Sequence, residues 1–181
     1  MIIAITGTIG AGKGVLVEYL KKKGFSHFSA REFIKKEIEK RGLTPDRDTM
    51  AAIANEIRKE HGATYIIESL YKDAVVANTD AVIESVREVA GAEFLKDEGA
   101  ILIAVDADRR VRYERIKERG QSTDDVTFEK FVEQEERELL SADPHSQNIL
   151  AVMEGADYLL MNNGSIKEFE EEIEALLASL E

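Results

Sequence analysis

Four glycines and one lysine near the N-terminus form the segment whose residue types and spacing point most directly to chemistry. The stretch GTIGAGK, residues 7–13, fits the pattern G-x-x-x-x-G-K (Walker A). Glycines allow a loop whose backbone N–H groups converge on one point, and a helix that begins there adds its partial positive charge. A lysine ammonium adds a full charge for the β- and γ-phosphates of a nucleotide. We therefore predict a phosphate-binding loop, with contacts from Gly7, Thr8, Gly10, Ala11, Gly12, Lys13 and Gly14.

The residue after the lysine departs from the usual pattern. Gly14 and then Val15 stand where a Ser or Thr hydroxyl ordinarily binds Mg²⁺. Two alternatives follow from this departure. Either magnesium is held mainly through phosphates and water, or the site is not a working phosphotransferase.

The elements around the loop fit an α/β protein. Strand-like apolar runs alternate with segments of helical periodicity, and this alternation favours a parallel sheet covered by helices. We expect strands in residues 2–6, 25–29, 81–86, 100–106 and 156–161. Helical patterns occupy most of 15–23, 31–42, 63–77, 108–119, 126–140 and the C-terminal segment. A further stripe runs from Met50 to Ile57, and we expect Asp48 or Thr49 to cap that helix.

Composition limits the classes of function. The 181 residues have 44% hydrophobic and 33% charged content, which is typical of one globular domain spanning 1–181. The net charge of -12 disfavours bulk nucleic-acid binding, since phosphate backbones would be repelled. The chain has no cysteine, and we expect neither a leader segment nor an apolar run that could span a bilayer. We expect a cytoplasmic protein without nucleic-acid or membrane partners; the oligomeric state stays open.

The loop and its surroundings resemble those of the small P-loop kinases. The stretch TGTIGAGKG (6–14) resembles the loop of adenylate kinases, which also have GAGKG, and the TGGIGSGK opening of dephospho-CoA kinases. The resemblance covers the whole chain, which is also similar to adenylate-kinase-related proteins of archaea and bacteria. This resemblance implies a three-layer αβα P-loop kinase fold with a parallel five-stranded sheet. It also implies acceptor-binding helices at about 30–77 and a lid at about 115–145.

The segment VIESVR (82–87) ends the third expected strand and resembles the LDGFPR segment of adenylate kinases. The resemblance implies that Glu84 orients water molecules on magnesium and that Arg87 grips the acceptor's phosphate. A plain strand end with two solvated charges is the alternative. The site interpretation is favoured because ligands of open α/β sheets bind beyond the carboxyl ends of the strands.

Arginines are concentrated on the two helical patterns that follow the fourth strand. Arg115 and Arg119 lie four residues apart on one helix face, where like charges cost free energy unless an anion joins them. In the small P-loop kinases such arginines belong to the lid and neutralise the transferred phosphoryl group, and the resemblance extends this role to Arg137. We expect surface ion pairs of little consequence from Arg109, Arg110 and Arg112.

Two further segments concern the donor and the acceptor. ADYLLMNNGS (156–165) resembles the dephospho-CoA kinase turn that faces adenine, which implies contacts from Asn163 and Gly164. SAREFIK (29–35) corresponds to STGDMLR of adenylate kinases, with Lys35 in place of the arginine and Arg31 in place of the glycine. We expect both residues to bind the acceptor, although AMP itself does not follow. The acidic DAD of dephospho-CoA kinases is missing from this strand end.

Together these features predict an ATP- and Mg²⁺-dependent kinase. It would transfer the γ-phosphoryl group to a small-molecule nucleotide-like acceptor, preferably a nucleoside or deoxynucleoside monophosphate. The expected catalytic side chains are Lys13, Arg87, Arg115, Arg119 and Arg137. A dephospho-CoA kinase and a regulatory or slow NTPase module remain as alternatives, and the choice between ATP and GTP is not determined.

Overall fold

The computed structural model describes residues 1–120, 126–139 and 148–180. The strands are β1 (Ile2–Gly7), β2 (Ser26–Ser29), β3 (Ala81–Glu84), β4 (Ile101–Asp106) and β5 (Tyr158–Met161). The helices are α1 (Lys13–Lys22), α2 (Ala30–Lys40), α3 (Arg47–His61), α4 (Tyr65–Ala77), α5 (Val89–Asp97), α6 (Arg109–Arg119), α7 (Phe128–Leu139), α8 (Ile149–Glu154) and α9 (Ile166–Leu180).

The strands form one five-stranded sheet in the order β2-β3-β1-β4-β5, and all neighbours are parallel. This confirms the predicted parallel sheet. β1 lies in the middle, with Ile5 in register with Glu84 of β3 and Gly7 in register with Val105 of β4. Because parallel strands end at the same edge, the glycine loop after β1 emerges between the carboxyl ends of β3 and β4.

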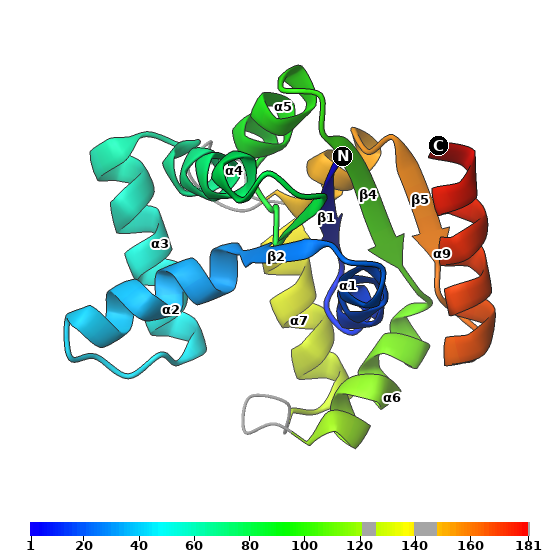
Figure 1. Cartoon of the computed structure of the whole chain (residues 1–181). Helices are drawn as coiled ribbons and strands as arrows, with labels where there is room; N and C mark the ends of the chain where they lie inside the picture. Colours follow the sequence, from blue (N-terminus) through cyan, green and yellow to red (C-terminus); the bar gives the residue numbers. More distant parts are fainter. Residues whose placement is uncertain (121–125, 140–147, 181) are drawn as a thin grey trace.

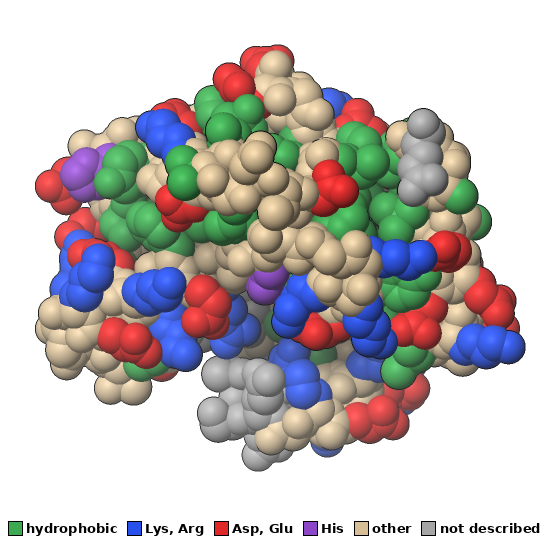
Figure 2. Space-filling model, viewed as in Figure 1, with side chains coloured by type: hydrophobic (Ala, Val, Ile, Leu, Met, Phe, Trp, Pro, Cys, Tyr) green, Lys and Arg blue, Asp and Glu red, His purple; other side chains and the backbone are tan. Residues whose placement is uncertain are grey.

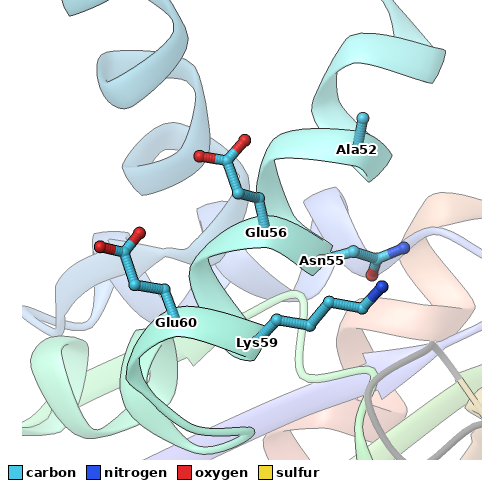
Figure 3. Close-up of a pocket in the computed structure, with 5 residues that line it drawn as sticks. All are labelled: Ala52, Asn55, Glu56, Lys59 and Glu60. Atoms are coloured by element: carbon cyan, nitrogen blue, oxygen red, sulfur yellow. The ribbon is translucent and has the colours of Figure 1, made fainter.

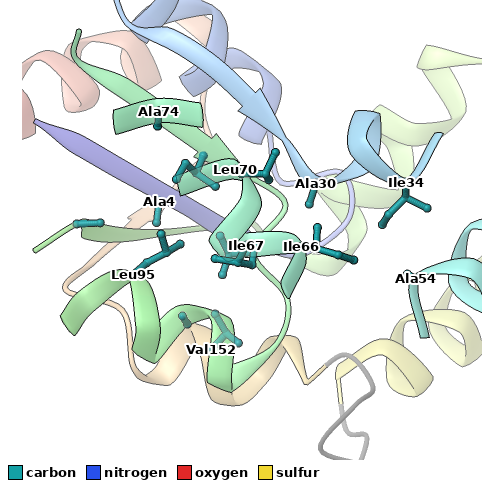
Figure 4. Packing of buried hydrophobic residues seen from close by; sticks show 14 of the residues in the cluster. Ala4, Ala30, Ile34, Ala54, Ile66, Ile67, Leu70, Ala74, Leu95 and Val152 are labelled. Atoms are coloured by element: carbon teal, nitrogen blue, oxygen red, sulfur yellow. The ribbon is translucent and has the colours of Figure 1, made fainter. Parts of the chain in front are cut away.

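Helices cover both faces of the sheet, as the three-layer prediction requires (Figure 1). Successive β1 side chains point to opposite faces. Ile3 and Ile5 join the core under α1 and α9, whereas Ala4 joins the core under α4, α5 and α8. The second core extends to α2 and α3 through Ile34 and Ala54 (Figure 4). No helix in the described part of the chain is both long and apolar enough to cross a membrane.

The helices α2 and α3 project beyond β2 and pack against each other, and α4 returns the chain to the sheet (Figure 1). The cap of α3 differs from expectation. The N-cap is Asp46, whose carboxylate accepts a hydrogen bond from the Thr49 backbone N–H at 2.8 Å. Asp48 instead lies in the first turn, where its charge favours the helix dipole.

Two helices, α5 and α8, were not predicted. α8 has only six residues, which is too short for a helical period to be evident. α5 has a glycine in its interior, and glycine disfavours helix by about 1 kcal/mol relative to alanine. Packing explains that glycine: a Cβ on Gly91 would lie 2.8 Å from Cγ1 of the buried Ile67 of α4. Gly91 therefore permits the close approach of α4 and α5.

We predict that Gly91→Ala lowers the free energy of unfolding by about 1 kcal/mol, because overpacking against Ile67 outweighs the gain in helix propensity. Urea denaturation followed by circular dichroism measures the change. Gly155→Ala is the matched control, since its added Cβ meets nothing closer than 3.6 Å. Equal stability of both variants and the wild type would contradict the tight α4–α5 contact.

Candidate functional site

The glycine loop leads directly into α1. Gly12 is the N-cap of α1 and has a φ of 100°, a left-handed conformation that favours glycine. A Cβ at this position would lie 2.2 Å from Nδ2 of Asn162. Among the described residues, no side chain caps α1 and its first turn has no acidic residue. The helix N-terminus therefore offers backbone donors and a partial positive charge to an anion.

Lys13 is the first residue of α1, and its side chain turns back onto the loop. Its Nζ donates hydrogen bonds to the carbonyl oxygens of Gly7 at 2.8 Å and of Thr8 at 2.7 Å. These bonds hold the ammonium against the backbone of the loop. The structure thus joins the predicted lysine and the predicted glycines in one local unit.

Glu84 ends β3 beside this unit. Its Oε2 lies 3.2 Å from Nε2 of His27 on β2. Burial raises the pKa of Glu84, but the hydrogen bond with His27 and the charges of His27, Lys13 and Arg87 outweigh it and lower the pKa below its ordinary value. The carboxylate is therefore ionised at neutral pH. Glu84, Lys13 and Arg87 are brought close enough for their charges to interact, whereas His27 was not predicted to take part.

A second carboxylate, Asp106 at the end of β4, lies on the other side of the loop. Its Oδ1 accepts hydrogen bonds from the Thr8 hydroxyl at 2.5 Å and from the Ala107 backbone N–H at 2.9 Å. Thr8 is buried, and this bond directs its hydroxyl to Asp106. Sequence reasoning missed Asp106, because only the strand order shows that the end of β4 adjoins the loop.

Arg112 of α6 corrects a prediction. An exposed surface pair was expected, yet Arg112 is only 5% exposed and packs against the loop. Its Nε donates to the Ala107 carbonyl at 2.7 Å, and its Nη1 donates to the Ile9 carbonyl at 3.3 Å. It also pairs with Glu135 of α7, which is 2% exposed. The partner is far along the chain, so sequence periodicity could not distinguish this buried pair from a surface pair.

The two neighbouring arginines behave differently. Arg110 forms an exposed pair with Glu114 at 3.4 Å, as predicted. Arg109 places its Nε 2.7 Å from the buried Oε2 of Glu135, so it belongs to the same network as Arg112. This network connects the first turn of α6 to α7.

The turn after β5 is tied to both the loop and α6. Asn162 is buried, and its Nδ2 donates to the Ala11 carbonyl at 2.8 Å. The Arg115 guanidinium donates to the carbonyl of Asn162 at 2.8 Å, to its Oδ1 at 3.3 Å and to the carbonyl of Gly164 at 3.1 Å. Asn163 accepts a hydrogen bond from the Asp108 N–H at 2.7 Å.

These contacts place Asn163 and Gly164 beside the loop, exposed, where the predicted contact with the donor's base is possible. Arg115 holds this turn in place through its hydrogen bonds, and the sequence did not predict this structural role. Its predicted contact with the transferred phosphoryl group stays a prediction. Asn162 was also missed as a functional residue, although it lies within the motif that drew attention to the turn.

The remaining predicted residues belong to helices α2, α6 and α7. Arg31 and Lys35 are on α2, and Lys35 Nζ lies 3.9 Å from Glu32 Oε2. Arg119 is exposed at the end of α6. Arg137 belongs to α7, but its side chain lies outside the described residues, as do 121–125 and 140–147 of the predicted lid.

The surface between α2–α3 and α6–α7 is hollowed, and Lys and Arg side chains gather around the hollow (Figure 2). A shallow groove of about 610 Å³ runs along α3. Asn55 and Lys59 point to one side of α3, and Glu56 and Glu60 point to the other (Figure 3). The groove belongs to the helical insertion and not to the phosphate loop. Within the described part of the chain, no cluster of three His, Asp or Glu residues could hold a metal ion.

Comparisons with known proteins agree with this architecture. Residues 3–141 match the model of a family described as an AAA domain. The UPF0200 protein of Thermococcus kodakarensis is 33% identical over 98% of this chain and 96% of its own length. The UPF0200 protein of Hyperthermus butylicus is 32% identical over 99% of this chain and 95% of its own length.

Solved structures extend the likeness to the fold. TT1252 from Thermus thermophilus has a TM-score of 0.65 at 19% identity, covering 100% of this chain and 98% of its own. Shikimate kinase from Bacteroides thetaiotaomicron has a TM-score of 0.62 at 17% identity, covering 98% of both chains. Dephospho-CoA kinase from Campylobacter jejuni has a TM-score of 0.61 at 15% identity, covering 99% and 96%. These likenesses confirm the predicted P-loop kinase fold.

We predict that Asn162→Ala lowers the free energy of unfolding by about 1–3 kcal/mol, because it leaves the buried Ala11 carbonyl and one Arg115 donor without this partner. Thermal and urea unfolding measure the change. Asn163→Ala is the matched comparison, since Asn163 lies in the same turn but is exposed, and its side chain accepts a hydrogen bond from the Asp108 N–H. A loss for Asn163→Ala equal to or larger than that for Asn162→Ala would contradict the role of Asn162.

Proposed function

Because the chain belongs to the UPF0200 family and to the family described as an AAA domain, and has the P-loop kinase fold, we propose that it transfers the γ-phosphoryl group of ATP to a nucleotide-like acceptor. The proposed acceptor is a nucleoside or deoxynucleoside monophosphate. The observation that carries the proposal is the position of Lys13 against the glycine loop, at the same edge of the sheet as Glu84, whose charge interacts with those of Lys13 and Arg87.

The donor would bind through the loop. Backbone N–H groups at the start of α1 and the Lys13 ammonium would hold the β- and γ-phosphates. The base would lie near Asn163 and Gly164, whose turn is fixed to the loop through Asn162 and to α6 through Arg115. Donor binding would therefore use both ends of the chain.

A magnesium ion would supply charge neutralisation to the triphosphate when bound. Gly14 has no hydroxyl, so the ligands for the ion would be phosphate oxygens and water. Glu84 fits a water-mediated contact because its carboxylate is ionised and lies near Lys13. His27 would keep that carboxylate in position through its 3.2 Å contact.

The acceptor would be an anion. Arg87, Arg31 and Lys35 supply positive charge in a chain whose net charge is -12. A phosphate acceptor suits this chemistry, since its second pKa is about 6 and its oxygens are ionised at neutral pH without a general base. Arg115, Arg119 and Arg137 are the proposed side chains that would neutralise the group in transfer.

One specific feature favours a second candidate, a nucleotide-binding module with slow hydrolysis. It is Gly14, which removes the direct hydroxyl ligand to magnesium. A coupled assay separates the candidates, using ATP with a panel of nucleoside monophosphates and dephospho-CoA. Acceptor-dependent ADP release supports a kinase and identifies the acceptor. ATP binding without acceptor-dependent turnover supports the module.

We predict that Lys13→Ala lowers kcat for ADP release by about 100-fold or more, because it removes the cation that faces the transferred phosphates. The same coupled assay measures the loss. Lys21→Ala is the control on the same helix, since Lys21 is exposed and pairs only with Glu18 among the contacts described for it. Turnover of Lys13→Ala at the level of the control would exclude the proposed donor site.

We predict that Lys35→Ala raises the KM for the acceptor about tenfold or more with little change in kcat, because a charge-assisted contact is worth about 1.5–3 kcal/mol. Initial rates at saturating ATP and varied acceptor measure the effect. Lys36→Ala is the control, as the adjacent exposed lysine of α2. If both variants keep the wild-type KM, the acceptor does not contact Lys35.

A further inference from the structure

A buried ion pair joins the helical insertion to the edge of the sheet. Arg58 of α3 contacts Glu88, the N-cap residue of α5, and each side chain is only 4% exposed. Arg58 also donates from Nη1 to Oδ1 of Asn55 at 3.0 Å. Glu88 directly follows Arg87, which is one of the residues proposed to bind the acceptor.

Stability alone does not account for this pair. Burial lowers the pKa of Arg58 and raises the pKa of Glu88, and each partner's charge opposes the shift of the other. Removing two charges from water costs several kcal/mol, and apolar side chains of similar volume often stabilise a protein equally well. A fixed geometry is what the ion pair adds over an apolar contact.

The surroundings indicate which geometry is fixed. Arg87 directly precedes Glu88 in the chain, and its charge acts on both Arg58 and Glu88. The backbone carbonyl of Arg87 accepts a hydrogen bond from the Asn148 N–H at 3.0 Å. The backbone of Arg87 is thus held in two ways. Its carbonyl is bonded to the N-cap residue of α8, and the next residue, Glu88, is held by the buried ion pair with Arg58.

We propose that Arg58 and Glu88 are positioning residues of the acceptor site, which hold α3 and residues 87–88 together so that Arg87 presents its guanidinium to a phosphate group of the acceptor. This inference rests on the proposed function. It assigns the pair no contact with the acceptor; its effect passes through Arg87 and the placement of α3.

The test replaces the charges while keeping the packing. Glu88→Gln, Arg58→Met and the double variant Arg58→Met/Glu88→Leu are compared with the wild type in thermal unfolding and steady-state kinetics. The probe is the monophosphate, among AMP, dAMP, CMP, UMP, GMP and dTMP, that the wild type turns over fastest. Arg41→Met is the matched control, since it breaks an exposed pair between α2 and α3, with Arg41 Nη1 2.7 Å from Glu56 Oε1.

We expect each single variant to lower the Tm, because one buried charge is left alone. The double variant regains the wild-type Tm, yet its KM for the acceptor stays about tenfold higher, which corresponds to about 1.4 kcal/mol. Its KM for ATP changes less than twofold, and Arg41→Met leaves both KM values unchanged.

Three results would overturn the inference. A double variant that regains stability together with the wild-type acceptor KM shows a structural pair only, and the proposed function then stands. An equal rise in both KM values shows a general distortion. If the double variant does not fold, Glu88→Gln is used in its place, and its KM for the acceptor is compared with its KM for ATP in the same way. If the wild type transfers phosphate to none of the probes, the proposed function fails first, and this inference fails with it.

Discussion

The position of β1 between two parallel strands is the constraint on which the candidate site depends. Its hydrogen bonds to β3 and β4 bring the carboxyl ends of three strands to one edge of the sheet. The glycine loop follows β1 there, Glu84 ends β3 and Asp106 ends β4. Residues that are far apart in the sequence become neighbours there, and a hydrogen bond joins Thr8 of the loop to Asp106. The helices then add cations from both sides, Lys13 from α1 and Arg112 from α6. A shift of one residue in either register would separate these groups.

Charge is organised in two buried pairs around this edge. Arg58–Glu88 connects the α2–α3 insertion to the segment after β3, and Arg112–Glu135 connects α6 to α7 beside the loop. Each pair joins a helix that lies outside the sheet to the place where phosphates would bind. Buried charges are expensive to desolvate, so their partners must stay in place. Among the described residues, the buried charged side chains are those of these two pairs, while most of the acidic residues lie at the surface.

The sequence predicted the features that a local pattern determines, and missed those that depend on distant contacts. The loop, the parallel sheet and the apolar faces of the helices follow from short-range spacing, and the structure and the comparisons confirm this fold. The burial of Arg112 and the bond from Asn162 to Ala11 join segments far apart in the chain. No periodicity encodes such pairings. α5 was missed for a related reason. Gly91 is required by its close contact with Ile67 of α4, and its own helix gives no local reason for a glycine at that position.

The contact between Gly12 and Asn162 has a consequence for variation within the family. The amide of Asn162 occupies the space that a side chain at position 12 would need, and it also bonds the backbone of the loop. Asn162 is therefore coupled to position 12 through volume and to the neighbouring Ala11 through a hydrogen bond. Related chains with asparagine at position 162 should keep glycine at position 12, because a side chain there would meet the amide and would also be strained at a φ of 100°. The C-terminal turn and the N-terminal loop would then evolve as one unit.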